Sequence, residues 1–215
     1  MIVPVTDPAS WGPTLDSAAK AVASGAAVIL PTDTVYGIGC TVFSPAAVSA
    51  ILAAKGRDRD APPPVLLPST AALGKVAYTG GLGRVLMNDF WPGPLTIIVE
   101  SLPQISTILG TNGTVAVRVP AHPAALALLE RTGPMAVTSA NITGGTPAVT
   151  AEEAERNLGQ HAAMTLDGGR CTLAQPSTIV DATGPLIRIV RLGAVSKVAL
   201  EGSVGEDGLL PGDSV

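Results

Sequence analysis

Short apolar segments rich in Val and Ile alternate along this chain with longer stretches of helix-forming residues, and this alternation constrains the fold most strongly. Strands that alternate with helices are typical of α/β domains, in which helices cover the faces of a sheet. We therefore expect a single α/β domain with a twisted mixed β-sheet and flanking helices. The predicted strands are 27–30, 95–100, 114–119, 135–138, 177–181 and 186–191, and the predicted helices are 15–24, 45–55, 82–90, 123–131 and 151–158.

Two of these helices have recognisable starts. Ser44 followed by Pro45 offers a capping hydroxyl and then proline at the first helical position. Thr150, with Glu153 three residues later, fits a capping box. Both patterns support helices that begin at these points.

The charge of the chain is concentrated at its C-terminal end. The formal net charge is −4, from 17 acidic and 13 basic residues, and four acidic residues lie in the last 15, which contain no Lys or Arg. Residues 1–200 are therefore neutral overall. We expect a catalytic domain over 1–200 and a flexible, acidic, Gly-rich tail over 201–215.

Composition excludes several classes of protein. The chain is 47% hydrophobic, yet its apolar runs fall short of the roughly 18–20 residues of a membrane span. The N-terminal stretch has no basic region followed by an apolar segment, so we expect a cytoplasmic protein without membrane association. Two cysteines without a CxxC motif and only two histidines make a zinc site improbable.

The segment 31–39, Pro-Thr-Asp-Thr-Val-Tyr-Gly-Ile-Gly, follows an apolar strand and carries several polar side chains. Ligands of open α/β sheets tend to bind where strands end, which favours a ligand-binding loop that includes Thr34 and Tyr36. The alternative, which stays open, is a turn whose Thr and Asp side chains bond their own backbone.

A cluster of cations follows the helix predicted at 45–55. Lys55, Arg57 and Arg59 could hold a polyanion, since arginine offers a planar fork to phosphate oxygens and lysine a point charge. A solvated charge run at the end of a helix is the alternative interpretation.

Other polar residues lie at the ends of predicted strands. Thr138, Ser139 and Asn141 follow one strand, where they could contact phosphate or adenine groups or instead bond locally within a loop. Thr114 and Arg118 share one face of another strand, and an arginine there needs an anion from the protein or from a ligand. The remaining polar candidates in the C-terminal part of the chain are Ser177, Thr178, Arg188 and Arg191.

Common phosphate-binding and hydrolase signatures are absent. The chain has no GxxxxGK[ST] loop, no GxGxxG motif, and no GxSxG around Ser139. Any phosphate site would therefore depend on dispersed Lys, Arg, Ser and Asn side chains.

Seven motifs occur in the order seen in the YrdC-like family, which this chain resembles over about residues 15–197. They are PTDTVYGIG, KGR, PGPLTIIV, TVAVRVPAHP, TSANITGG, STIVD and IVRLG. The resemblance implies formation of L-threonylcarbamoyladenylate and pyrophosphate from L-threonine, bicarbonate and ATP, with Mg²⁺ accompanying ATP. It also implies a downstream threonylcarbamoyl transferase complex that modifies tRNA, and possible contact with tRNA or RNA.

The resemblance also assigns site residues. The family's catalytic tetrad corresponds to Lys55, Arg57, Ser139 and Asn141, with Lys55 and Arg57 expected to neutralise charge on the phosphates. The substrate-binding positions correspond to Thr34, Tyr36, Thr114, Arg118, Thr138, Ser177 and Arg191.

This chain departs from the family near the cation cluster. Many relatives have Pro where Asp58 stands, and polar residues where this chain reads Ala-Pro-Pro-Pro-Val-Leu over 61–66. The expected lid over the site is either the segment 58–69 or the stretch 196–215.

Two alternatives remain. One is a double-stranded RNA or tRNA-binding module without turnover, although few aromatics and a neutral body weaken it. The other is a carbamoyl-adenylate-forming module like that of hydrogenase maturation factors, which are multidomain proteins.

Overall fold

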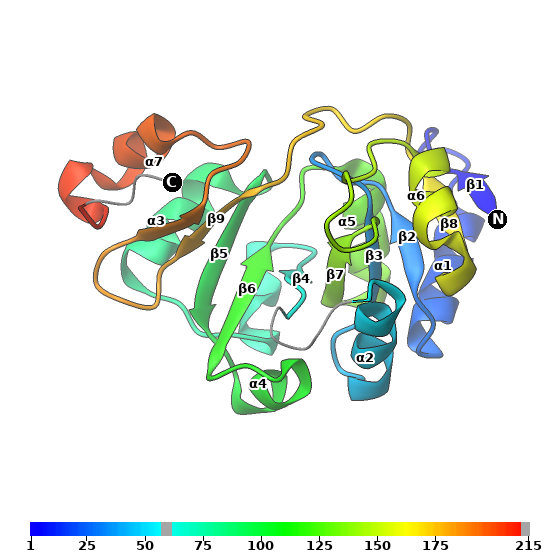
Figure 1. Ribbon diagram of the computed structural model, residues 1–215, viewed down its shortest axis with the longest axis horizontal. Helices are drawn as coiled ribbons and strands as arrows, with labels where there is room; N and C mark the ends of the chain where they lie inside the picture. Colours follow the sequence, from blue (N-terminus) through cyan, green and yellow to red (C-terminus); the bar gives the residue numbers. More distant parts are fainter. Residues whose placement is uncertain (57–61, 212–215) are drawn as a thin grey trace.

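A ten-stranded mixed sheet runs the length of the molecule (Figure 1). The computed structural model describes residues 1–56 and 62–211. The strand order is β1-β8-β2-β3-β7-β4-β6-β5-β9-β10. The strands are β1 (Ile2–Pro4), β2 (Val28–Leu30), β3 (Gly37–Thr41), β4 (Val65–Leu66), β5 (Leu95–Glu100), β6 (Thr114–Arg118), β7 (Met135–Ser139), β8 (Thr165–Asp167), β9 (Thr178–Asp181) and β10 (Arg188–Arg191).

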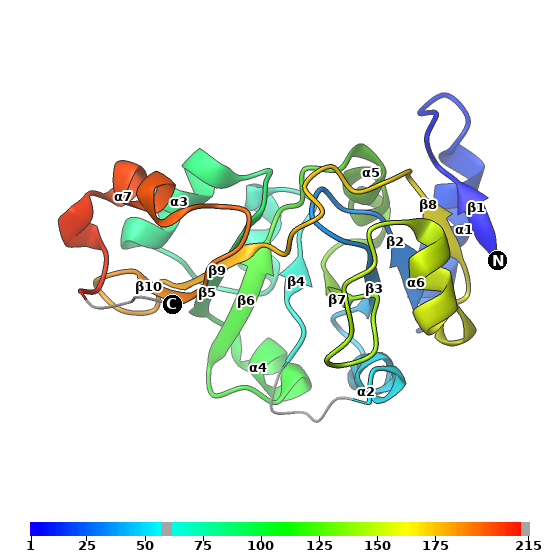
Figure 2. The ribbon, with the colours of Figure 1, turned by 45° about the horizontal axis from the view of Figure 1, so that its top comes forward.

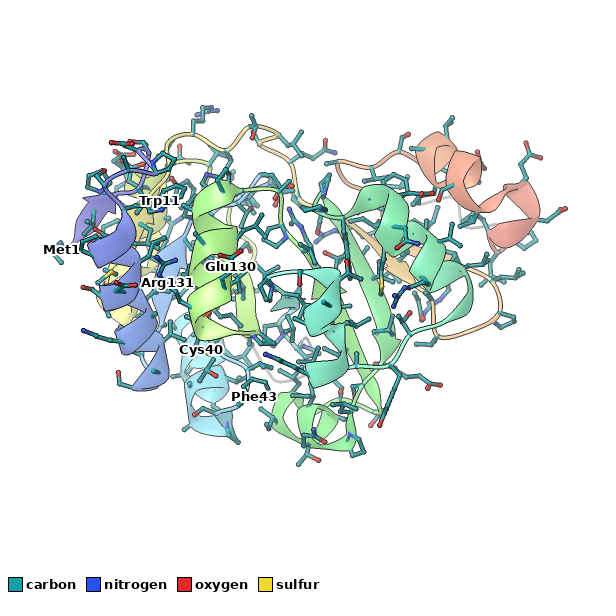
Figure 3. The ribbon with its side chains drawn as sticks, turned by 180° about the vertical axis from the view of Figure 1, so that it is seen from behind. Met1, Trp11, Cys40, Phe43, Glu130 and Arg131 are labelled. Atoms are coloured by element: carbon teal, nitrogen blue, oxygen red, sulfur yellow. The ribbon has the colours of Figure 1, made fainter. Side chains whose placement is uncertain are left out.

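Helices cover both faces of this sheet, with α1, α3 and α5 on the rear face (Figure 3). Helices α1 and α5 pack on each other, and α6 packs on β8 and β1. The α-helices are α1 (Gly12–Ala23), α2 (Pro45–Ala54), α3 (Gly81–Phe90), α4 (Pro103–Leu109), α5 (Pro123–Thr132), α6 (Ala151–Leu158) and α7 (Lys197–Val204). Short 3₁₀ turns occupy Thr70–Lys75, Gly159–His161 and Glu206–Gly208. No helix within the described ranges is long and apolar enough to cross a membrane.

The local signals for helix starts are confirmed. The Ser44 hydroxyl accepts from the Ala47 amide, with Pro45 in the first turn of α2. The Thr150 hydroxyl accepts from the Glu153 amide, and the Glu153 carboxylate accepts from the amide of Val149, one residue before the cap. This reciprocal pair holds the start of α6 as the sequence predicts.

Two groups of buried side chains form the core. The smaller joins α1 and α5 to β2 through residues such as Leu15, Leu128 and Leu30. The larger spans the rest of the sheet and includes Ile38, Ile97 and Leu200. Burial of this aliphatic surface is the main source of stability, because the chain has few aromatic side chains to contribute.

Strand β4 lies at the centre of the sheet although it is only two residues long. Val65 and Leu66 pair parallel to β6 on one side and antiparallel to β7 on the other. Pro62, Pro63 and Pro64 precede the strand, and proline lacks the amide hydrogen that a sheet ladder needs. The prolines therefore limit how far this strand can extend.

The predicted α/β fold is confirmed, and the predicted elements match observed ones with small shifts at their ends. The strands β1, β3, β4 and β8 and the helices α4 and α7 were not predicted. Strand β3 lies partly within the segment 31–39, which was expected to be entirely loop. Its Gly37 and Gly39 lie so close to Val137 that a Cβ would contact that side chain at 2.5 and 2.6 Å, respectively.

The expectation of a flexible tail over 201–215 is wrong for its described part, which ends at Pro211. Residues 201–204 complete α7, which packs against α3 (Figure 2). Leu200 and Leu209 are buried, and the amide of Leu210 donates to the carbonyl of Ile187 at 2.9 Å. The apolar residues of this acidic stretch hold it to the domain, so the domain continues past residue 200.

Candidate functional site

A cavity of about 370 Å³ opens on the sheet between its two halves. Its lining comes from the loop after β2, from the prolines before β4, and from β5, β6, β7, β9 and β10. Eight of the predicted site residues line it: Thr34, Tyr36, Thr114, Arg118, Thr138, Ser139, Ser177 and Arg191. Distant segments of the chain thus converge on one cavity of the size that small-molecule sites have.

Arg118 lies at the end of β6 and is only 5% exposed. Its Nη2 donates to the Asp33 carboxylate at 2.5 Å, its Nη1 to the Thr34 hydroxyl at 2.9 Å, and its Nε to the Gly93 carbonyl at 2.9 Å. Burial lowers the pKa of this guanidinium, and the Asp33 carboxylate opposes that shift. Arginine has five N–H groups, so two are left for an oxyanion in the cavity.

Asp33 is the functional residue that sequence reasoning missed. Its Oδ1 also accepts from the amide of Ala121 at 3.0 Å, while its Oδ2 is buried and without a hydrogen-bond partner among the described residues. The signal was present, since an arginine on a Val-rich strand requires an anion. Of the two sources considered, the protein itself supplies that anion.

The loop after β2 combines both interpretations offered for it. The Thr32 hydroxyl donates to the Val35 carbonyl at 2.6 Å and accepts from two amides of the turn, which is local turn bonding. Thr34 instead faces the cavity and Arg118. Because Thr32 gives its proton to Val35, the Thr34 hydroxyl donates to Thr32 at 2.9 Å and has only a lone pair left for a ligand.

Tyr36 is fully buried, and its hydroxyl is engaged by the protein. It donates to the Gly169 carbonyl at 2.6 Å and accepts from the Gly168 amide at 3.2 Å. Burial raises the pKa of this phenol. Tyr36 therefore joins the cavity wall to the loop after β8, with its hydroxyl held by that loop.

Lys55, at the end of α2, is 2% exposed and contacts the loop after β7. Its Nζ donates to the carbonyls of Ser139 and Asn141 at 2.6 and 2.7 Å. The Ser139 hydroxyl and the Asn141 side-chain oxygen each lie 3.4 Å from it. A solvated charge run is thus wrong for Lys55, whereas Arg57 lies outside the described residues.

Asn141 also bonds within its own loop. Its Nδ2 donates to the carbonyls of Ile142 and Gly145 at 2.9 and 2.7 Å. Lys55 and Asn141 are not among the described residues that line the cavity, while Ser139 is. Three members of the predicted tetrad therefore meet, and Ser139 is the one that faces the cavity.

The opposite wall of the cavity carries Ser177 and Arg191. The Ser177 and Thr96 hydroxyls lie 2.8 Å apart, and Arg191 Nη2 donates to the Ser177 carbonyl at 2.7 Å. Thr178 points elsewhere, since its hydroxyl donates to the Val195 carbonyl. Arg188 pairs with Asp181 at 2.8 Å on the exposed side of β10.

The family model Sua5/YciO/YrdC, which carries the description telomere recombination, matches residues 20–193. The chain belongs to the Sua5/YciO/YrdC family. It is 44% identical over 203 residues to a protein of Mycobacterium tuberculosis named putative threonylcarbamoyl-AMP synthase, covering 94% of each chain. It is 35% identical over 211 residues to the threonylcarbamoyl-AMP synthase of Bacillus subtilis, covering 94% of this chain and 60% of that one.

A solved family structure agrees with these relatives. The crystal structure of Pyrococcus abyssi Sua5 complexed with L-threonine superposes with a TM-score of 0.92 at 32% identity. The match covers all of this chain and 65% of that one, so this chain spans about two thirds of the longer protein.

The described parts of both segments that were expected to act as a lid contain regular secondary structure. The segment 58–69 includes strand β4, which pairs on both sides in the sheet. Within the stretch 196–215, α7 packs against α3. Among the described residues of the first segment, Pro62, Pro63, Pro64 and Leu66 contribute to the cavity wall, and they offer no polar side chain there.

The cysteines of this family member are unsuited to nucleophilic catalysis. Burial raises the pKa of Cys40 to about 12 and that of Cys171 to about 11, so both thiols stay protonated at neutral pH. Burial also lowers the pKa of His122, whose Nδ1 has no partner among the described residues. The described part of the chain contains no cluster of three His, Cys, Asp or Glu side chains suited to a metal.

Proposed function

We propose that this protein is an L-threonylcarbamoyladenylate synthase, which forms threonylcarbamoyl-AMP and pyrophosphate from L-threonine, bicarbonate and ATP. The observation that carries the proposal is the convergence of six of the seven family motifs on one cavity, which the buried Arg118 lines. The names of the M. tuberculosis and B. subtilis relatives and the threonine complex of P. abyssi Sua5 support it.

Arg118 is the residue proposed to hold the carboxylate of threonine. Asp33, Thr34 and Gly93 each accept from a different nitrogen of the guanidinium, so its orientation is set before a ligand arrives. The two remaining N–H groups suit a carboxylate, which arginine binds with charge-assisted hydrogen bonds. A preorganised fork of this kind costs little ordering entropy on binding.

The chemistry needs positioning rather than a protein nucleophile. The amine of threonine adds to CO₂ with loss of a proton, or to bicarbonate with loss of water, and gives a carbamate. A carbamate oxygen then attacks the α-phosphorus of ATP as pyrophosphate leaves. Holding the reactants in line contributes several kcal/mol to such transfers, typically about 7–11 kcal/mol. Enclosure in the cavity keeps water from the carbamate, and Ser139, Thr138 and Arg191 are proposed to contact the nucleotide.

Mg²⁺ is proposed to enter with ATP. The described cavity wall offers hydroxyl and carbonyl oxygens but no carboxylate cluster, and Mg²⁺ commonly binds through substrate phosphates while it keeps several waters. Bound in that way, it would neutralise charge on the phosphates. Arg57 is proposed to add positive charge there, on the strength of the family resemblance alone.

The direct test is pyrophosphate release. Purified protein incubated with ATP, Mg²⁺, bicarbonate and labelled threonine should release pyrophosphate only when threonine is present. Release that does not depend on threonine, or none at all, would overturn the proposal. Carbamoyl phosphate in place of threonine tests for a hydrogenase-maturation type of activity, and salt-sensitive RNA binding without turnover would favour the RNA-binding alternative.

The chemistry of the product indicates what kind of reaction consumes it. An acyl-adenylate of a carbamate hydrolyses readily, so we propose that a threonylcarbamoyl transferase complex consumes it in the cytoplasm and passes the group to tRNA. Direct contact between this chain and tRNA is part of the same proposal.

A further inference from the structure

The ammonium of Lys55 lies inside a group of four oxygens, which we call the oxygen cage. The cage consists of the Ser139 carbonyl at 2.6 Å, the Asn141 carbonyl at 2.7 Å, and the Ser139 hydroxyl and Asn141 Oδ1, both at 3.4 Å. An ammonium has three N–H donors, and the two carbonyl contacts are short. The cation thus draws two backbone carbonyls of one loop toward a single point.

The main chain of Lys55 holds the same loop at a second place. Its carbonyl accepts from the Thr143 hydroxyl at 3.0 Å and from the Thr143 amide at 3.3 Å. One residue at the end of α2 therefore fixes both ends of the segment 139–143. Asn141 Nδ2, from the middle of that segment, donates to the Gly145 carbonyl two residues past its end, at 2.7 Å.

Ser139 connects Lys55 to the cavity, because it contacts the ammonium and also lines the cavity. Ser139 is half-buried and lines the cavity, whereas Lys55 is absent from the described cavity wall. The carbonyl of Ser139 is bound by the ammonium, so the direction of the Ser139 main chain depends on it. A change at Lys55 would reach the cavity through Ser139.

We propose that Lys55 is a positioning residue, which acts on the reaction by fixing the loop 139–143 rather than by contacting the phosphates. This rests on the proposed function of the cavity. It differs from the expected role of Lys55 in neutralising phosphate charge, because the ammonium would be a structural cation within the protein. The oxygen cage is suited to an ammonium group, and a free ammonium ion has the same donors.

The first test is Lys55→Met, which keeps the aliphatic stem, with the exposed Lys20→Met on α1 as its matched control. Without any ligand, we expect amide hydrogen exchange to become faster at residues 139–145 in Lys55→Met and to stay unchanged in Lys20→Met. The rate of threonine-dependent pyrophosphate release should fall at least about 100-fold, as displacement of a site by about 1 Å can do. The KM for threonine should change less than about threefold.

Chemical rescue separates a structural cation from general salt effects. Ammonium chloride is compared with sodium chloride at equal ionic strength. It should restore slow hydrogen exchange at 139–145 in Lys55→Met and raise the rate of pyrophosphate release by this variant at least about tenfold. Unchanged exchange in ligand-free Lys55→Met, with loss of ATP affinity alone, would overturn the proposal. The exchange experiment needs no turnover, so its result is independent of whether the protein proves to be a synthase.

A second variant keeps the lysine in place. Thr143→Val removes the hydroxyl that bonds to the Lys55 carbonyl and leaves the side-chain charge intact. Faster exchange at 139–145 and a rate three- to tenfold lower are expected. Wild-type exchange and rate in this variant would contradict the proposal, and the result stands even if Lys55→Met fails to fold.

Discussion

Arg118 and Lys55 are both buried cations, 5% and 2% exposed, yet their surroundings differ in kind. Arg118 faces a carboxylate, a hydroxyl and a carbonyl, and still lines the cavity. Lys55 donates to two carbonyls of one loop and is not among the described residues that line the cavity. Arg118, which is proposed to bind a ligand, is thus held by two side chains and one carbonyl from other segments, whereas Lys55, which is proposed to position a loop, binds the main chain of that loop.

The largest effect should come from Arg118→Met. The variant leaves the Asp33 carboxylate buried without its partner, which typically costs about 3–5 kcal/mol, and it should abolish threonine-dependent turnover. Lys55→Met removes the donor from two neutral carbonyls of the cage, which typically costs about 1–3 kcal/mol. Urea unfolding of both variants measures how far each one lowers the free energy of unfolding.

Two further variants control this comparison. Arg188→Met breaks a pair on the surface, in which the arginine side chain is 54% exposed, so it should cost no more than about 1 kcal/mol. Adding Asp33→Asn to Arg118→Met removes the uncompensated charge and should recover part of the stability that Arg118→Met loses. A larger destabilisation by Lys55→Met than by Arg118→Met would show that the two cations have been distinguished wrongly.

Thr34→Val should have a smaller effect, confined to the Arg118 side of the comparison. It removes the hydroxyl that accepts from Arg118 Nη1 at 2.9 Å, and leaving that donor unsatisfied costs about 1–2 kcal/mol. We expect the KM for threonine to rise about tenfold while hydrogen exchange at residues 139–145 stays as in the wild type. Thr107→Val, an exposed position on α4, is the matched control. An effect of Thr34→Val on the loop would mean that the two regions are coupled.

The smallest effect concerns pH and His122, which lies beside the Asp33–Arg118 pair. Burial lowers the pKa of this imidazole in the folded state, so the unfolded chain binds more protons in the window below its ordinary value of about 6.5. The contribution of neutral His122 to the free energy of unfolding is therefore fully present above about pH 6.5, and it is lost as the pH falls below that value. The melting temperature of His122→Gln should fall less than that of the wild type from pH 7 to pH 5. The melting temperature of the exposed His161→Gln should follow that of the wild type. Equal decline in both variants would contradict this assignment.

Much of the fold was predictable because local patterns agreed with tertiary structure. The predicted strands at 95–100 and 114–119 are β5 and β6, and a period of two placed Thr114 and Arg118 on one face, where both line the cavity. Strand β4 was missed because two residues after three consecutive prolines carry no periodic signal. The C-terminal stretch was misjudged because its acidic and Gly-rich composition outweighed the apolar residues that are buried in it.

The candidate site was predictable in its members but not in its contacts. The need of Arg118 for an anion followed from its strand, whereas its pairing with Asp33 depends on a sheet order that no local pattern reveals. Lysine at the end of a helix is usually solvated, so nothing local marked Lys55 for burial. Its burial comes from a loop more than eighty residues away.

The two residues of β4 connect five strands on one side of the sheet with four on the other. Val65 faces Ala136 and Val117, and Leu66 faces Met135 and Arg118, so the same two residues set the register of both halves. Thr34 and Ser139 belong to one half, and Arg118 and Ser177 to the other. This two-residue strand therefore acts as a spacer, which separates β7 from β6 and contributes to the distance between the residues proposed to bind the two reactants.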